Sequence, residues 1–152
     1  FLRNKYPMDW SPNSNIRSVE FYRCSFGSEG AKNLVPFLRA STGITEILTT
    51  GNKIGSEGLE SIVGALDERA ITNLDFGCCG IDDISCLKHF KLPQLELLYL
   101  DENSIGDEGA KIIVNYLLPY APKLKRLYVN RCGISHHWIE SIKSATSATI
   151  HN

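Results

Sequence analysis

The feature that most constrains the fold is a pattern of apolar residues in residues 95–109, LELLYLDENSIGDEG. Leu95, Leu98 and Leu100 are followed by Asn103 and Ile105. In an extended segment alternate side chains point to opposite faces, so the last two leucines face one way and the residues between them face the other. The pattern predicts a short strand with one buried face. After it comes a turn, where the amide of Asn103 can bond to backbone groups.

The same frame occurs five times along the chain. In order, the copies are Ile16, Val19, Phe21, Cys24 and Phe26; Ile44, Ile47, Thr49, Asn52 and Ile54; Ile71, Leu74, Phe76, Cys79 and Ile81; Leu95, Leu98, Leu100, Asn103 and Ile105; and Leu124, Leu127, Val129, Cys132 and Ile134. Successive copies begin 24 to 29 residues apart. One such unit cannot bury its apolar face alone, whereas stacked units share a continuous core.

A helix is expected after most of these strands. Three copies continue with GSEG, GSEG and GDEG, which makes Ser28, Ser56 and Asp107 candidate N-caps. Apolar stripes with helical spacing follow. A Gly-rich turn before a helix can also cradle phosphate. The acidic residue in each of these turns favours capping instead. The third copy is followed by a short apolar set, so one or two helical turns at most are expected there.

The period near 28 and the alternation at one position resemble the ribonuclease-inhibitor-like class of leucine-rich repeats. The alternating residues are Cys24, Asn52, Cys79, Asn103 and Cys132. The resemblance covers about residues 16–144. It implies an α/β leucine-rich-repeat solenoid of about five repeats, a right-handed arc with parallel strands on the concave face and helices on the convex face. The class contains inhibitors, GTPase-activating proteins, actin regulators and innate sensors, so the partner stays open.

The repeats also suggest how the chain is divided. Residues 1–15 are expected to form an N-terminal cap or the remnant of a preceding repeat, because they contain no copy of the frame. Residues 16–144 form the repeat domain. Residues 145–152 are expected to be a frayed C-terminal tail, since the apolar helical stripe ends before them.

The exposed strand positions predict a binding surface on the concave face. Tyrosine and arginine are enriched there, as they are in protein interfaces and their hot spots. The candidate partner-binding residues are Glu20, Tyr22, Arg23, Asp75, Tyr99, Asp101, Glu102, Arg126, Tyr128, Asn130 and Arg131. The alternative is that the acidic and basic members pair across adjacent strands on a solvated face.

Composition argues against other binding classes. A net charge of −1 gives no general attraction to nucleic acid or anionic membrane. The basic cluster of Lys123, Lys125, Arg126 and Arg131 lies beside an acidic strand. No apolar run approaches the roughly 18 residues of a membrane span. We therefore predict neither a nucleic-acid nor a membrane partner.

The sequence holds no recognisable catalytic or cofactor motif. His136, His137 and Glu140 are a poor metal candidate, because two or three ligands without a nearby cysteine pair make a weak site. The odd count of five cysteines favours free thiols in a reducing compartment. We predict a cytoplasmic protein that is not an enzyme and holds no metal or cofactor.

These observations predict a non-enzymatic protein–protein interaction module, a scaffold or regulator that binds its partner through the concave face. The alternative is a regulator of an enzyme, such as a RanGAP-type GTPase-activating protein or an inhibitor, as a fragment of a longer repeat array. The open ends of a repeat stack also make an oligomer possible.

Overall fold

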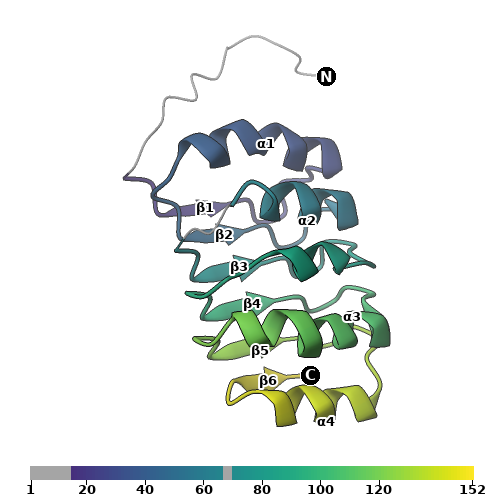
Figure 1. Cartoon of the computed structure of the whole chain (residues 1–152). Coiled ribbons are helices and arrows are strands. Elements are labelled where there is room, and N and C mark those ends of the chain that lie inside the picture. The colour runs from purple at the N-terminus through teal and green to yellow at the C-terminus, as the bar shows by residue number, and fades with distance from the viewer. Residues whose placement is uncertain (1–14, 67–69) are drawn as a thin grey trace.

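The computed structural model describes residues 15–66 and 70–152 as a two-layered repeat structure (Figure 1). One layer is a six-stranded parallel sheet whose strands follow one another in chain order. The strands are β1 (Ser18–Glu20), β2 (Glu46–Leu48), β3 (Asn73–Asp75), β4 (Leu97–Tyr99), β5 (Arg126–Tyr128) and β6 (Thr149–His151). Each has only three residues, so the sheet is stable only as a stack.

The second layer is a row of helices on one side of the sheet (Figure 1). In chain order they are α1 (Ser28–Ala40), α2 (Gly55–Val63), the 3-10 helix η1 (Ser85–His89), α3 (Gly106–Ile112), the π-helix η2 (Ile113–Leu117), the 3-10 helix η3 (Leu118–Tyr120) and α4 (His136–Ala145). The third repeat therefore carries only η1, which confirms the short helical segment predicted there. The two layers confirm the α/β leucine-rich-repeat solenoid.

The core lies between these layers. The middle residue of every strand points into it, and Ile47, Leu74, Leu98 and Leu127 are almost fully buried. The helical stripes cover them from the other side, as Leu38 and Ile62 illustrate. The burial confirms that the strand frame and the helical stripes face each other.

Asn103 occupies the turn as predicted. Its amide nitrogen donates to the carbonyls of Phe76 and Leu100, each at 2.8 Å, and its oxygen accepts from the amides of Cys79 at 3.1 Å and Ile81 at 2.9 Å. One side chain thus satisfies backbone groups of two neighbouring repeats that no strand neighbour reaches. Asn52 makes the same kind of link to the first repeat.

The cysteines at the same position behave less uniformly. Cys79 and Cys132 are buried, and their thiols contact backbone carbonyls. Cys24, at the same repeat position, is instead exposed. Cys79 and Cys132 each contact a carbonyl of the preceding repeat. Residues 1–14, which precede the first repeat, lie outside the described part of the chain.

The N-cap prediction is wrong for all three candidate residues. α1 begins at Ser28 itself, α2 and α3 begin at Gly55 and Gly106, and none of these helices has a side-chain cap bond. The backbone of both glycines is left-handed, with φ of 63° and 58°, which glycine adopts without strain.

Two of the three expected caps bond to the next repeat instead. Ser56 Oγ donates to Asp82 Oδ1 at 2.6 Å and accepts from the amides of Asp82 at 3.2 Å and Asp83 at 2.9 Å. Asp107 Oδ1 accepts from the amide of Ser135 at 2.7 Å. These side chains therefore join repeats rather than cap helices.

The end of the chain also differs from the expectation of a frayed tail. Thr149–His151 form β6, which pairs in parallel with β5 in the same register as the earlier strands. Ile150 matches Leu127 and turns toward the core. Residues 1–14 of the expected N-terminal cap lie outside the described residues, so that expectation stays a prediction.

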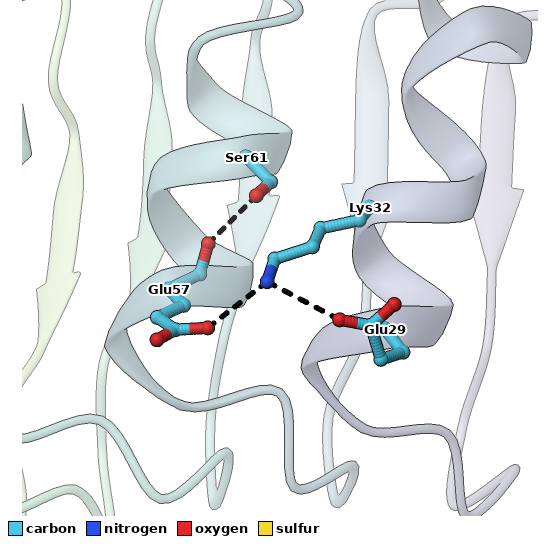
Figure 2. Close-up of polar contacts among 4 residues, drawn as sticks. All are labelled: Glu29, Lys32, Glu57 and Ser61. Atoms are coloured by element: carbon cyan, nitrogen blue, oxygen red, sulfur yellow. Dashed lines mark hydrogen bonds and ion pairs between the residues drawn. The ribbon is translucent and has the colours of Figure 1, made fainter.

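Charged side chains connect the helices on their outer surface. Figure 2 shows Lys32 of α1 between two carboxylates, 3.3 Å from Glu29 on its own helix and 3.1 Å from Glu57 on α2. Ser61 Oγ donates to the Glu57 carbonyl at 2.8 Å. Lys32 thereby bridges the exposed surfaces of α1 and α2.

Candidate protein-binding face

The sheet face turned away from the helices, called the open face below, presents two rows of side chains. The first row is Ser18, Glu46, Asn73, Leu97, Arg126 and Thr149, and the second is Glu20, Leu48, Asp75, Tyr99, Tyr128 and His151. The register continues without a slip across all six strands, so equivalent repeat positions are direct neighbours. These residues are exposed or half-buried, whereas the strand middles between them turn inward.

An aromatic ladder occupies the second row at β4, β5 and β6. The rings of Tyr99 and Tyr128 are stacked with centroids 4.2 Å apart and planes 8° apart. Tyr128 and His151 are stacked at 4.2 Å and 5°. Stacking restricts the rotamers of all three rings. Burial, with the neighbouring Tyr128 adding to it, raises the pKa of Tyr99.

Two carboxylates converge beside this ladder. Asp75 is in the second row, and its Oδ1 accepts from the amide of Gly77 at 2.9 Å. A Cβ atom placed on Gly77 would lie 3.3 Å from an oxygen of both Asp75 and Asp101, so both side chains reach the same point. Burial raises the pKa of Asp101, and the negative charges of Asp75 and Glu102 add to the effect. The open face is thus aromatic with an acidic flank.

One acidic and basic pair of predicted residues is engaged across adjacent repeats, as the alternative interpretation expects, and one further contact lies within the first repeat. Arg131 Nη1 lies 3.1 Å from Glu102 Oε1 across adjacent repeats. Arg23 Cζ lies 5.1 Å from the centroid of the Tyr22 ring. Exposed pairs of this kind add little stability. Glu102 and Arg131 are therefore weaker candidates for contact residues than the aromatic ladder.

The predicted residues do not form one cluster. Glu20, Tyr22 and Arg23 belong to the first repeat, and β2 and β3 separate them from Tyr99. Arg126 is in the first row of β5, and its charge acts on Tyr99. The second repeat also contributes Leu48, which is outside the set of candidate partner-binding residues and lies between Glu20 and Asp75.

The strand ends hold their side chains in a fixed direction. Arg23, Cys78, Glu102 and Arg131 occupy the same repeat position, and their φ values are 49°, 52°, 57° and 55°. Gly51 takes this position in the second repeat with φ of 74°. Four non-glycine residues in the left-handed region show that the turn geometry overrides local preference. The turn therefore decides how these residues are presented.

Sequence reasoning missed His151, because residues 145–152 were expected to be a tail. A signal was present in the sequence. Ile150 occupies the second position of the frame, equivalent to Leu127, and His151 then occupies the position of Tyr99 and Tyr128. The convergence of Asp75 and Asp101 had no such signal, since they occupy different repeat positions.

The structure adds little support for a metal site at His136, His137 and Glu140 or for a binding site at the basic cluster. Within residues 15–66 and 70–152, no three His, Cys, Asp or Glu side chains are placed to hold a metal. Glu140 instead pairs with Lys143 at 3.0 Å. Of the basic cluster, Lys123 bonds Gln94 and Lys125 pairs with Glu96, both at 2.6 Å. Among the described helices, none is both long and apolar enough to cross a membrane.

The fold and the stacked strand frame define a leucine-rich-repeat protein. A sequence model of the family described as "Leucine Rich repeat" matches residues 50–63 and 91–114. An internalin from Listeria monocytogenes has a similar fold, with a TM-score of 0.54 and 18% identity over 91% of this chain and 41% of the internalin. Proteins of this fold generally mediate protein–protein interactions.

Three curated relatives indicate which class of leucine-rich-repeat protein the chain is similar to. The ribonuclease inhibitor of Sus scrofa is 24% identical over 141 residues, which is 88% of this chain and 31% of the pig protein. That of Mus musculus is 23% identical over 80% of this chain and 28% of the mouse protein. The NACHT, LRR and PYD domains-containing protein 5 of Bos taurus is 22% identical over 81% of this chain and 12% of the bovine protein. The chain has the leucine-rich-repeat fold and is similar to the ribonuclease-inhibitor-like class, and it spans a third or less of these relatives.

Proposed function

We propose that the chain is a non-enzymatic module that binds a protein partner through the open face, which is centred on the aromatic ladder of Tyr99, Tyr128 and His151. The stack carries this proposal, because it places three rings side by side on an exposed sheet surface. Aromatic side chains supply large contact areas at low entropic cost. The adjacent carboxylates of Asp75 and Asp101 add a polar flank.

Four further predicted residues form the rim of this surface in the proposal, whereas Glu20, Tyr22 and Arg23 lie apart from it on the first repeat. Arg126 lies in the next row, and Glu102, Asn130 and Arg131 follow at the strand ends. Rim charges mainly set association rate and selectivity. A cytoplasmic location is part of the proposal, supported by five free thiols. Oligomerisation through the repeat ends stays a prediction.

The test compares two variants that remove the same chemistry from opposite layers. Tyr99→Ala with Tyr128→Ala truncates the ladder. Tyr116→Ala with Tyr120→Ala truncates two exposed tyrosines from the helix side. Proteins captured by the wild-type chain would be identified by mass spectrometry, and their affinities measured with purified components. The ladder variant should weaken binding by about tenfold or more, and the control variant should not.

Folding must be separated from recognition in this test. Circular dichroism would check both double variants, and Arg126→Glu offers a change at the same face that leaves the rings in place. Equal affinity of the wild type and the ladder variant, with both folded, would move the binding surface away from the open face.

A second candidate is inhibition of a ribonuclease, favoured by the names of the pig and mouse relatives. The chain spans about a third of their length, so this activity is testable rather than implied. A pancreatic-type ribonuclease would be assayed on a fluorogenic RNA substrate with increasing amounts of the chain. Inhibition that the ladder variant relieves would support this function. Undiminished cleavage at micromolar chain would exclude it for this segment.

A further inference from the structure

Two exposed tyrosines lie together on the helix side of the fourth repeat. Tyr116 is 42% exposed and Tyr120 is 45% exposed, and among the described residues Tyr22 alone is another large apolar side chain with this degree of exposure. Tyr116 belongs to η2 and Tyr120 ends η3. Four residues are about one helical turn, so the two side chains are close neighbours on the layer opposite to the open face.

Each of these tyrosines has a lysine ammonium group over its ring. Lys88 Nζ lies 5.7 Å from the Tyr116 ring centroid, and Lys91 Nζ lies 5.7 Å from that of Tyr120. The lysines come from η1 and the segment after it, which the Leu92 amide joins to η3 by donating to the Tyr120 carbonyl at 3.3 Å. A ring face is a weak acceptor, so both ammonium groups can still donate to an oxygen atom.

Neither lysine is neutralised within the chain. Within residues 15–66 and 70–152, Lys88 and Lys91 form no ion pair with a carboxylate. Four other lysines do, namely Lys32, Lys111, Lys125 and Lys143. Lys123, three residues after Tyr120, donates at 2.6 Å to the uncharged side chain of Gln94. The two exposed rings therefore lie in a region whose positive charges have no counter-ion among the described residues.

We propose that Tyr116, Tyr120, Lys88 and Lys91, called the tyrosine–lysine patch below, form a docking site for an acidic segment of a protein partner. In such a segment carboxylates flank an apolar side chain. The apolar side chain would pack on the tyrosine rings, and the carboxylates would accept hydrogen bonds from the two ammonium groups. Charge complementarity determines the occupant, because these cations have no counter-ion of their own.

The charges beside the patch favour a short acidic segment over nucleic acid. Lys88 also lines a hollow of about 390 Å³ between α2 and η1, and the same lining includes Glu60 and Asp83. A nucleic acid carries a phosphate at every nucleotide, so its backbone would meet these carboxylates as well as the lysines. An acidic peptide can place its carboxylates at the two lysines alone.

The test measures peptide binding at individual tyrosines of the full chain. The probes are two blocked peptides, acetyl-AEEFEEA-amide and acetyl-AQQFQQA-amide, which share length and the apolar anchor and differ only in charge. Each is titrated into chain with 13C-labelled tyrosine side chains and followed by NMR. The signals of Tyr116 and Tyr120 report on the tyrosine–lysine patch, whereas those of Tyr99 and Tyr128 report on the open face.

The acidic peptide should shift the Tyr116 and Tyr120 signals and bind at least about threefold more tightly than the neutral peptide, a factor in keeping with two exposed charge pairs. This preference should disappear in a Lys88→Gln, Lys91→Gln variant. It should persist in Lys53→Gln with Lys143→Gln, a control that removes the same charge from exposed positions elsewhere. High salt should reduce it.

Equal affinity for the two peptides, a preference that survives in the Lys88→Gln, Lys91→Gln variant, or no shift of Tyr116 and Tyr120 at millimolar peptide would overturn the proposal. An oligouridylate that shifts these two signals at lower concentration than the acidic peptide would also overturn it, in favour of nucleic acid.

The two proposed surfaces fail or succeed separately. The ladder variant should keep the peptide preference and lose the open-face partner. Tyr116→Ala with Tyr120→Ala should weaken acidic-peptide binding, which in that variant is followed by backbone amide signals, and should keep the open-face partner. The same two variants therefore distinguish failure of the tyrosine–lysine patch from failure of the open face.

Discussion

At the scale of single residues, one turn position decides how strongly adjacent repeats are joined. Asn103 is 3% exposed and bonds five backbone groups. The equivalent Cys132 is 2% exposed and offers a thiol that contacts the Leu100 carbonyl at 3.1 Å. A thiol is a weaker hydrogen-bonding group than a side-chain amide, which has two N–H donors and a carbonyl acceptor. The asparagine repeats should therefore contribute more to stability than the cysteine repeats.

Replacing Asn103 by alanine should destabilise the chain by roughly 2–4 kcal/mol, because buried backbone donors and acceptors lose their partners. Asn103→Cys, which copies the neighbouring repeats, should cost less. Urea denaturation followed by circular dichroism would measure both. Asn115→Ala, on an exposed helix position, is the control and should change stability by less than about 0.5 kcal/mol. Similar losses for Asn103→Ala and Asn115→Ala would contradict this account.

Asp101→Asn should have the opposite effect at neutral pH. The pKa of Asp101 is raised above its ordinary value of 3.8 by burial and by neighbouring carboxylates. For a carboxyl group whose folded-state pKa is raised, the charged form costs stability above that pKa, and the cost disappears below 3.8. The variant should therefore raise Tm by about 1–3 °C at pH 7 and leave it unchanged near pH 3. Thermal melts at the two pH values would show this, and a stabilisation of equal size at both would contradict it.

At the scale of elements, Ser28 and Ser56 show that the same short sequence, GSEG, can make different contacts in different repeats. Both occupy the second position of a GSEG turn, and neither caps its helix. Ser56 bonds two amides and a carboxylate of the next repeat. For Ser28, no side-chain hydrogen bond is formed with any of the described residues. The difference depends on what the following repeat offers, here the Asp82 and Asp83 turn.

Ser56→Ala should therefore cost about 1 kcal/mol, because two exposed amides lose an acceptor, whereas Ser28→Ala should cost only a few tenths. Chemical denaturation of the two variants gives the comparison. Ser56→Asp should restore part of the loss, since Asp107 at the equivalent position accepts from the Ser135 amide. Equal destabilisation by the two alanine variants would favour the capping role that the sequence predicts.

The sequence reveals the strands and helical stripes because their periodicity reports burial directly. Leu98 and Leu127 turn inward as predicted. It does not reveal how the turns are closed, because Ser56 and Asp107 find their partners in the next repeat. Tyr99 and Tyr128 are neighbours because they share a repeat position. His151 was missed because a single strand without its helix gives a weak pattern. The Asp75 and Asp101 pair depends on side-chain direction, which spacing does not contain.

At the scale of the whole molecule, the two layers present different surfaces. The open face offers stacked rings and a carboxylate pair. The helix side offers a hollow created by the short η1. The hollow lies between α2 and η1, in the second and third repeats, whereas the stacked rings lie on β4, β5 and β6. The strands of the third and fourth repeats still keep register although the third repeat is the shortest. A shortened helix therefore changes one layer without disturbing the other.

Stability should be graded along the stack, because each repeat contacts only its neighbours. β3 pairs on both sides, and the Phe76 amide donates to the Tyr99 carbonyl at 3.0 Å. β6 pairs with β5 alone among the described strands, and Ile150 is only half-buried where Leu74 is fully buried.

Amide hydrogen exchange should therefore be at least about tenfold slower for Phe76 than for Thr149, whose amide donates to the Lys125 carbonyl at 2.8 Å. Exchange followed by NMR would resolve both amides. Ile142→Ala, which loosens α4 beside β6, should speed exchange at Thr149 and leave Phe76 unchanged. Equal protection at both amides, or loss of both in this variant, would show that the chain opens as one cooperative unit rather than repeat by repeat.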